Sequence, residues 1–440
     1  MMLNEIELVN FRGIEKMLLP FPKKTTAILG VNGVGKSSVL DALAIALSNM
    51  TERIVGQAAR ARKMSPDDIK SGEGFARLKV SVDLGADGPT TWAIALNRHK
   101  KATKKADEQS SDFEALNAQA SLLNGRMLYR ESKSLPINLP LAVYYDVHRA
   151  VLDAPLRVKG GLKNTPREAY HDALGHGGTD FRSFFAWFRD REDVENERLR
   201  DDPGHVDRDL KAVRDSIAKF TGFTKLKIRR KPSLRMTVQK GLVEFNVLQL
   251  SDGEKCLLAL VGDLARRLSL LNTERADPLE GEGIVLIDEI DLHLHPKWQR
   301  ELIDYLTNLF PNTQFIVTTH SPLIVQAAAA RDANIVVCRR EGDHVVIDQS
   351  VEAVRGWRAD QILTSDLFDL PSTRDTEIEK LEKEQRAILS KAKLTKADEK
   401  RAKEISQVLS SLRVMENPED DEAMRIIRES AKYLQSNGRK

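Results

Sequence analysis

The sequence of 440 residues predicts an α/β fold built on a largely parallel β-sheet. Short apolar runs alternate with helical patterns along most of the chain, as expected for strands that are joined by crossover helices. A glycine-rich loop separates one apolar run from a helix, and another apolar run ends in two carboxylates. Both features are typical of a sheet that binds a ligand at the carboxyl ends of its strands.

The composition excludes several classes of protein. Hydrophobic residues make up 41% and charged residues 30% of the chain, which is ordinary for a folded globular protein. The net charge is only +3, so we do not expect a strongly basic DNA-coating protein, although local basic patches are compatible with it. No apolar stretch approaches the roughly 20 residues of a membrane span. Two cysteines are too few for a disulfide framework, so we expect a cytoplasmic protein with no membrane partner.

The first predicted elements belong to an amino-terminal lobe, residues 1–158. Alternation of apolar and polar residues predicts the strands, and a continuous apolar pattern after the glycine-rich loop predicts a buried helix. The expected elements are strands over 3–9, 25–29, 78–84, 92–96 and 141–145 and a helix over 37–47.

Three further regions follow. In a helical insertion at 159–222, four phenylalanines from Phe181 to Phe188 have the spacing of one helix face. A second lobe at 223–370 returns to alternating strands and helices. Its expected strands lie within 226–245 and at 284–287, 314–319 and 334–338. The highly charged residues 371–440 predict a helical hairpin or arm, with a helix that starts at Thr395.

The strongest motif, GVNGVGKS at residues 30–37, matches the pattern of a phosphate-binding loop. Glycines let the backbone N–H groups point at phosphates, and the helix that follows adds the positive end of its dipole. We expect Lys36 to reach the β- and γ-phosphates and the Ser37 hydroxyl to bind Mg²⁺. The residues expected to contact the nucleotide here are Gly30, Asn32, Gly33, Gly35, Lys36, Ser37 and Ser38.

An acid pair follows the apolar strand at 284–287. After a phosphate loop, Asp288 is expected to hold the Mg²⁺ through water, and Glu289 is expected to polarise the attacking water. One strand later, residues 317–322 end a strand in His320, which we expect to sense the γ-phosphate. A purely structural histidine is the alternative.

The motif LSDGEK at residues 250–255 opens another helical pattern. Ser251 and Glu254 have the spacing of a capping box, which places free N–H groups of a helix N-terminus where an anion can meet them. A plain capped helix explains these residues equally well.

Together and in this order, the four motifs resemble those of the ATP-binding-cassette (ABC) ATPases. The start VNFRG at residues 9–13 resembles the SMC and RecF branch of that family. The resemblance implies an ABC-type P-loop ATPase head, with a mixed sheet and an antiparallel β subdomain, that binds ATP and Mg²⁺. It identifies residues 30–37 as the Walker A loop, Asp288 and Glu289 as Walker B, and His320 as the switch histidine. The catalytic residues it implies are Lys36, Glu289 and His320.

The same resemblance implies a homodimer with ATP between two subunits, or a higher oligomer. Residues 250–255 resemble the ABC signature, with Asp252 in place of a glycine. The residues that the resemblance places at the shared site are Arg12, Ser251, Gly253 and Glu254, and those of the D-loop are His293 and His295. No glutamine follows the strand at 141–145, so His148 is the candidate for the Q-loop position.

Several longer segments resemble the ATPases of Septu and retron antiphage systems. These segments are residues 139–151, 184–197, 260–268, 365–372 and the Walker B region through 303. The resemblance implies a bacterial defence ATPase that pairs with an HNH endonuclease. Its nucleic acid would be the RNA-linked DNA of a reverse transcriptase, or phage DNA. A RecF-like repair ATPase that clamps DNA and a scaffold that holds ATP without hydrolysis remain the alternatives.

Overall fold

The computed structural model describes residues 1–56, 59–85, 88–98, 109–147, 165–175, 181–342, 344–348, 354–365, 367–368, 370, 375–391 and 395–411. The chain divides into two units, Met1–Asp369 and Leu370–Lys440. All strands of the described residues belong to the first unit.

The core of the first unit is a six-stranded sheet in the order β13-β12-β3-β11-β10-β6. Its strands are β3 (Thr25–Leu29), β6 (Leu141–Tyr145), β10 (Gly283–Ile287), β11 (Thr313–Thr318), β12 (Asn334–Glu341) and β13 (His344–Asp348). The pairings are parallel except for β12 with β13. Every residue of β3, β6, β10 and β11 is buried, as a sheet covered on both faces requires. The predicted α/β fold with a largely parallel sheet is confirmed.

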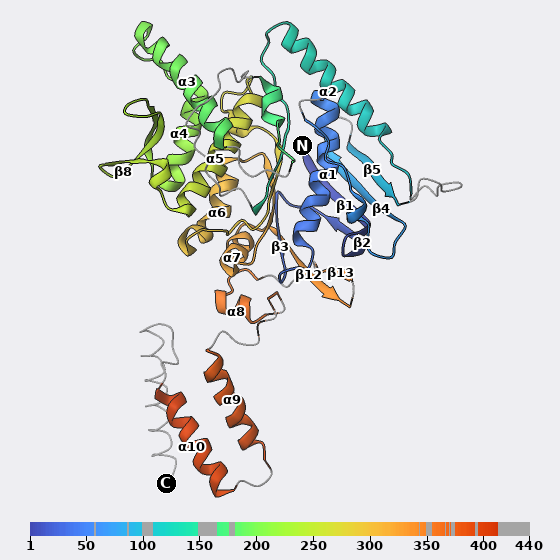
Figure 1. Ribbon diagram of the computed structural model, residues 1–440, viewed down its shortest axis with the longest axis vertical. Helices are drawn as coiled ribbons and strands as arrows, with labels where there is room; N and C mark the ends of the chain where they lie inside the picture. Colours follow the sequence, from blue (N-terminus) through green and yellow to red (C-terminus); the bar gives the residue numbers. More distant parts are fainter. Residues whose placement is uncertain are drawn as a thin grey trace, which may run out of the picture. The chain divides into compact units, whose positions relative to one another are not determined.

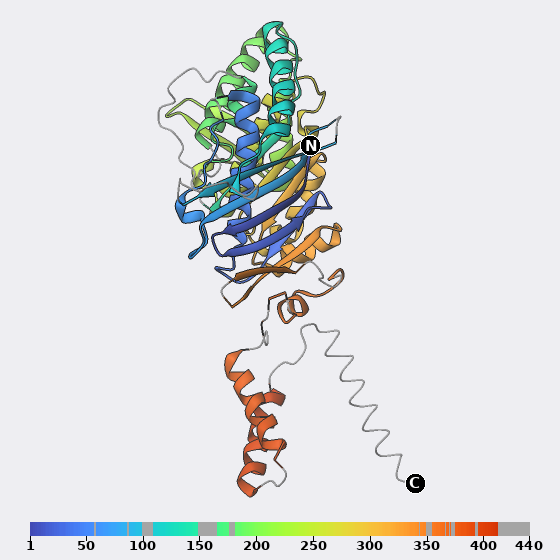
Figure 2. The ribbon, with the colours of Figure 1, turned by 90° about the vertical axis from the view of Figure 1, so that its right-hand side faces the viewer.

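Strands from the amino-terminal part of the chain form a second, four-stranded antiparallel sheet in the order β2-β1-β4-β5 (Figure 2). Its strands are β1 (Met2–Phe11), β2 (Ile14–Pro20), β4 (Phe75–Asp83) and β5 (Pro89–Asn97). The predicted strands over 78–84 and 92–96 are found as β4 and β5, which pair antiparallel as a hairpin, whereas β2 was not predicted. Helix α1 (Lys36–Val55) contacts β4 of this sheet and β6, β10 and β11 of the other, which explains why nearly all of its faces are buried.

The remaining helices of the first unit pack on the two larger sheets and on one another (Figure 1). They are α2 (Glu114–Ser132), α3 (Phe181–Asp201), α4 (Arg208–Thr221), α5 (Asp252–Leu271), α6 (Pro296–Leu309), α7 (Pro322–Ala330) and α8 (Ala359–Leu363). The short 3-10 helices are η2 (Pro66–Asp68), η5 (Pro166–Tyr170), η6 (Val247–Gln249) and η7 (Pro278–Glu280). The predicted phenylalanine stripe of α3 is buried, and α2 was not predicted.

A small three-stranded sheet lies beside α3 and α4, on the side of the unit opposite β4 and β5 (Figure 1). It consists of β7 (Thr224–Arg229), β8 (Arg235–Lys240) and β9 (Val243–Asn246), all paired antiparallel. This sheet leads through η6 directly into α5, so it stands next to the signature motif in the chain.

The second unit is a helical hairpin of α9 (Thr376–Leu389) and α10 (Lys396–Ser411), as predicted. Among the described residues of this unit, Ile388, Ala402 and Ile405 form its buried apolar cluster. Thr395 and Asp398 form reciprocal hydrogen bonds at the start of α10, which confirms the predicted helix start. The last part of the predicted helical arm, residues 412–440, and the candidate Q-loop residue His148 lie outside the described residues. No helix in the described part of the chain is long and apolar enough to cross a membrane.

Candidate functional site

The predicted phosphate loop, residues 30–37, connects β3 to α1. Gly30, Gly33 and Gly35 have φ values of 146°, 81° and 96°, a region that other residues rarely adopt. A Cβ atom on Gly30 would lie 2.4 Å from the carbonyl oxygen of Cys338, so a side chain does not fit there. Gly35 is the N-cap of α1, and no side chain caps that helix. The N–H groups of its first turn are therefore available to an anion.

Lys36 and His320 lie in contact although 284 positions separate them in the chain. The Lys36 ammonium donates to the carbonyl oxygens of Gly30 at 2.9 Å and Val31 at 3.2 Å, and lies 2.8 Å from Nε2 of His320. Burial lowers the pKa of Lys36. Burial and the positive charge of Lys36 both lower the pKa of His320. A neutral His320 therefore accepts a hydrogen bond from the ammonium at Nε2.

The acid pair stands at the carboxyl end of β10. Asp288 is buried, and its carboxylate accepts a hydrogen bond from the hydroxyl of Thr318 at the end of β11. The same hydroxyl accepts a hydrogen bond of 2.7 Å from the backbone N–H of Glu289. Glu289 has a φ of 46°, in the left-handed region that is uncommon for such a residue. Thr318 thus fixes the position of both acids, a role that we did not predict, although it stands two residues before His320.

The switch histidine and the D-loop form one hydrogen-bonded unit. The hydroxyl of Thr319 donates to the carboxylate of Asp291, and the backbone N–H of His320 approaches the same carboxylate oxygen at 3.4 Å. The two predicted D-loop histidines have local roles next to this unit. His293 has a φ of 61°, and His295 is the N-cap of α6, where its Nδ1 accepts a hydrogen bond from the N–H of Lys297.

Arg12 lies at the end of β1, where its φ of 52° begins the turn into β2. Its guanidinium donates to the carboxylates of Asp41 in α1 at 2.5 Å and Asp68 at 2.9 Å. Arg62 also pairs with Asp41, at 2.9 Å. Arg12 therefore ties the amino-terminal hairpin to the helix that follows the phosphate loop. Its predicted contact with the nucleotide stays a prediction, and its pairing with Asp41 was not predicted from the sequence.

The signature motif caps α5 as predicted. The N–H and hydroxyl of Ser251 donate to Oε2 of Glu254, at 2.9 and 2.8 Å, and the N–H of Glu254 approaches the Ser251 hydroxyl at 3.4 Å. A Cβ atom on Gly253 would lie 2.5 Å from the carbonyl oxygen of His293. The backbone of the signature turn therefore packs against the D-loop of the same chain, which only glycine allows.

The signature motif and the phosphate loop of one chain are separate. Within the described residues, no hydrogen bond or ion pair joins residues 250–255 to residues 30–37. The signature instead lines an open hollow of about 710 Å³ together with D-loop residues and the amino-terminal end of α6. The structure thus gathers Lys36, Asp288, Glu289 and His320 into one region and places Ser251, Gly253 and Glu254 in another.

A buried ionised cluster joins the strand before the Q-loop to the signature helix. The hydroxyl of Tyr145, the last residue of β6, donates to Asp263 of α5 at 3.0 Å. Asp263 is fully buried and pairs with Arg266 at 3.0 Å and Arg267 at 2.7 Å. Burial alone would raise the pKa of Asp263, but the two arginines hold this pKa below its ordinary value. The candidate Q-loop residue itself, His148, belongs to the part of the chain that is not described.

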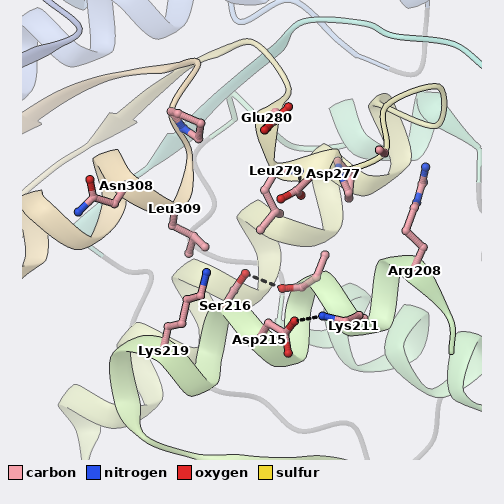
Figure 3. Close-up of a pocket in the computed structure, with 14 residues that line it drawn as sticks. Arg208, Lys211, Asp215, Ser216, Lys219, Asp277, Leu279, Glu280, Asn308 and Leu309 are labelled. Atoms are coloured by element: carbon pink, nitrogen blue, oxygen red, sulfur yellow. Dashed lines mark hydrogen bonds and ion pairs between the residues drawn. The ribbon is translucent and has the colours of Figure 1, made fainter.

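Another pocket, of about 320 Å³, lies among α4, η7 and the end of α6 (Figure 3). Charged side chains of both signs surround it, and Lys211 pairs with Asp215. Arg208 donates to the carbonyl oxygens of Thr273 and Arg275. None of the predicted nucleotide-binding residues lines this pocket, and the carboxylates of Asp277 and Glu280 do not favour a polyphosphate. We therefore place it outside the candidate site.

The fold and the order of the motifs define an ABC-type ATPase. Two family models match the chain: "AAA ATPase domain" over residues 1–121 and "AAA domain, putative AbiEii toxin, Type IV TA system" over residues 128–326. The chain is 31% identical to the retron Ec83 probable ATPase of Escherichia coli, over 73% of this chain and 68% of the relative. It is also 31% identical to the retron Vc95 probable ATPase of Vibrio cholerae, over 76% of this chain and 73% of the relative. The chain belongs to this family of antiphage-defence ATPases.

More distant similarities accompany these matches. The Septu protein PtuA of Bacillus thuringiensis is 23% identical over 85% of this chain and 86% of its own length. Among solved structures, an Smc head bound to the C-terminal winged-helix domain of ScpA covers 79% of this chain, with 16% identity and a TM-score of 0.46.

Proposed function

We propose that this chain binds ATP and Mg²⁺ between two copies of itself, hydrolyses the ATP, and through this cycle regulates a partner nuclease in antiphage defence. The observation that carries the catalytic part is the contact between Lys36 and His320 beside the acid pair. Strand ends that are distant in the sequence converge there on one edge of the sheet, where a phosphate loop opens.

The residues present fit a magnesium ion. Ser37 is exposed at the start of α1, and the Asp288 carboxylate is held in place by Thr318. Hydroxyl and carboxylate oxygens are ligands that Mg²⁺ prefers, and the ion would neutralise charge on the phosphates. The bound ATP would displace the Lys36 ammonium from the carbonyl oxygens of Gly30 and Val31, so that it donates to the β- and γ-phosphates. Glu289 would orient the attacking water, and His320 would contact the γ-phosphate.

The homodimer is proposed because each chain holds only part of the expected site. Among the described residues, no hydrogen bond or ion pair joins the signature turn of Ser251, Gly253 and Glu254 to the phosphate loop of its own chain. It borders an open hollow in which the triphosphate of a second copy would find the N-terminus of α5. Arg12, held next to α1, would lie on the nucleotide side of the same shared site.

The proposed partner is an HNH endonuclease, and the supporting observation is membership of the retron ATPase family with its similarity to a Septu protein. In a retron setting, a reverse transcriptase and its RNA-linked DNA would join the complex. In a Septu setting, phage DNA would be the nucleic acid. Assembly beyond the dimer is part of the same proposal, with the highly charged second unit as a surface available for it.

The test is to express the tagged chain from its native locus and identify what co-purifies. Recovery of a small HNH protein, with or without a reverse transcriptase, is the expected result. In parallel, the Glu289→Gln chain is expected to bind ATP, turn it over very slowly and accumulate as a dimer, whereas Lys36→Ala stays monomeric. If the native chain brings down only bulk duplex DNA, the partner nuclease is wrong and a RecF-like clamp is the better account. Wild-type turnover by Glu289→Gln would remove Glu289 from its role.

A further inference from the structure

The hollow beside the signature motif contains a lysine that the sequence motifs do not include. Lys240, the last residue of β8, lines this hollow together with Ser251, Gly253 and Glu254. Its ammonium donates to Oε1 of Glu254 at 2.8 Å and lies 5.8 Å from the centre of the Phe223 ring. The Lys240 side chain is 58% exposed, whereas that of Glu254 is 10% exposed. A residue of the small β7–β9 sheet is thus in direct contact with the signature turn.

Glu254 is the residue through which Lys240 acts on the signature serine. One carboxylate oxygen of Glu254 accepts hydrogen bonds from the N–H and the hydroxyl of Ser251, and the other accepts the Lys240 ammonium. The only hydroxyl proton of Ser251 is therefore directed at Glu254. Burial alone would raise the pKa of Glu254, but the contacts with Lys240 and Ser251 hold this pKa below its ordinary value. Glu254 is thus an ionised carboxylate at a place where an anion is expected.

The balance of charge in the hollow depends on Lys240. Two carboxylates stand at the signature turn, those of Asp252 and Glu254. Asp252 pairs with Lys255 at 3.2 Å within the same helix turn, and Glu254 pairs with Lys240. A negative charge within a few ångströms opposes the approach of a polyphosphate in a partly buried site. Without Lys240, the carboxylate of Glu254 would face the incoming phosphates without its neutralising partner.

We propose that Lys240 is a positioning residue of the shared site. It neutralises Glu254, so that the terminal phosphates of a nucleoside triphosphate held by a second copy of the chain can reach Ser251. This inference rests on the proposed function, because it requires that the phosphates come from another copy. It also makes the β7–β9 sheet a structural input to the ATP-dependent step, since any movement of β8 would change the contact between Lys240 and Glu254.

The test uses the Glu289→Gln chain as the parent, because slow hydrolysis preserves the ATP-bound assembly. Self-association at saturating ATP is measured by light scattering for the parent and for chains that also carry Lys240→Met, Glu254→Gln or both. Glutamine keeps the capping oxygen of residue 254 but removes its charge. The matched control is Lys225→Met, which removes an exposed lysine from β7 of the same sheet. Binding of a fluorescent ATP analogue to the single chain is measured at low protein concentration.

We expect Lys240→Met to weaken ATP-dependent self-association by about tenfold or more, with no change in ATP binding by the single chain. Lys240→Arg and Lys225→Met should associate like the parent. In the Glu254→Gln background, Lys240→Met should have little further effect, because no charge is left to neutralise. A merely structural role for Lys240 would instead lower the thermal stability in both backgrounds alike.

Each other outcome overturns a distinct part of the account. If Lys240→Met associates as strongly as its parent, Lys240 does not have the proposed positioning role, but the proposed dimer is unaffected. A loss that persists in the Glu254→Gln background means that Lys240 does not act through Glu254, which contradicts the proposal. If the parent itself fails to associate with ATP, the shared site is wrong, and the role of Lys240 falls with it.

Discussion

The two halves of the expected ATP site differ in how they are built. The half around the phosphate loop brings together side chains from three strand ends, and buried or partly buried hydrogen bonds hold them. The half around the signature motif is made of local contacts, namely a capping box, one lysine and a glycine packed on the D-loop, and it borders an open hollow. The difference indicates that the first half is preformed in a single chain, whereas the second half is an open surface, which is where the proposed second copy would complete the site.

The largest expected effect comes from removing the lysine of the preformed half. Lys36→Ala deletes the ammonium that would neutralise the β- and γ-phosphates, and we expect ATP turnover to fall by a factor of about a hundred or more. Phosphate release measures this effect, and Lys16→Ala on the exposed surface of β2 is the control. Turnover within a few-fold of wild type would mean that the phosphate loop does not bind the reacting nucleotide.

The signature half is broken by Gly253→Ala, since the added Cβ atom would meet the carbonyl oxygen of His293 at 2.5 Å. We expect turnover to fall roughly tenfold to a hundredfold while the single chain still binds ATP normally, because the phosphate loop is untouched. Gly125→Ala in α2, where nothing lies within 4 Å of the new atom, is the matched control. Loss of ATP binding by the single chain would contradict the separation of the two halves.

Thr318→Val tests whether the hydroxyl that holds both acids matters to the preformed half. The substitution keeps the shape but removes the hydroxyl that accepts from the Glu289 N–H and donates to the Asp288 carboxylate. We expect a loss of about 1–3 kcal/mol in the free energy of unfolding and about a tenfold loss of turnover. Thr318→Ser should restore most of the turnover. If serine fails to do so while folding normally, the hydroxyl is not the group that acts.

The smallest expected effect is on the pH dependence of stability. The pKa of His320 in the folded chain lies below its ordinary value of about 6.5, so the unfolded chain takes up this proton first as the pH falls. The contribution of His320 to the free energy of unfolding therefore decreases as the pH falls below about 6.5. The decrease ends once the pH is below the pKa that His320 has in the folded chain. Thermal unfolding of wild type and His320→Gln between pH 5 and 8 should show a slightly steeper loss in wild type. Parallel curves would mean that the His320 pKa is not shifted.

The sequence predicted those parts of the molecule that depend on neighbours in the chain. The strand, loop and helix around residues 30–37 and the capping box at Ser251 are local patterns with strong preferences, and both are found. The apolar residues of the missed helix α2 do not lie on one buried face: only Leu116, Ala120 and Met127 are buried, whereas Leu122, Leu128 and Tyr129 are exposed, so its helical pattern is weak. Thr318, Asp41 and Lys240 were missed because their roles come from contacts with residues far along the chain, which no local spacing reveals.

The most direct test of the shared site mixes two inactive chains. One carries Lys36→Ala and keeps its signature motif, and the other carries Gly253→Ala and keeps its phosphate loop. If ATP lies between two copies, a mixed dimer contains one complete site, formed by the phosphate loop of one chain and the signature motif of the other, so turnover in the mixture should rise well above the sum of the two separate chains. Turnover in the mixture that is no higher than the sum of the two separate chains would contradict the account.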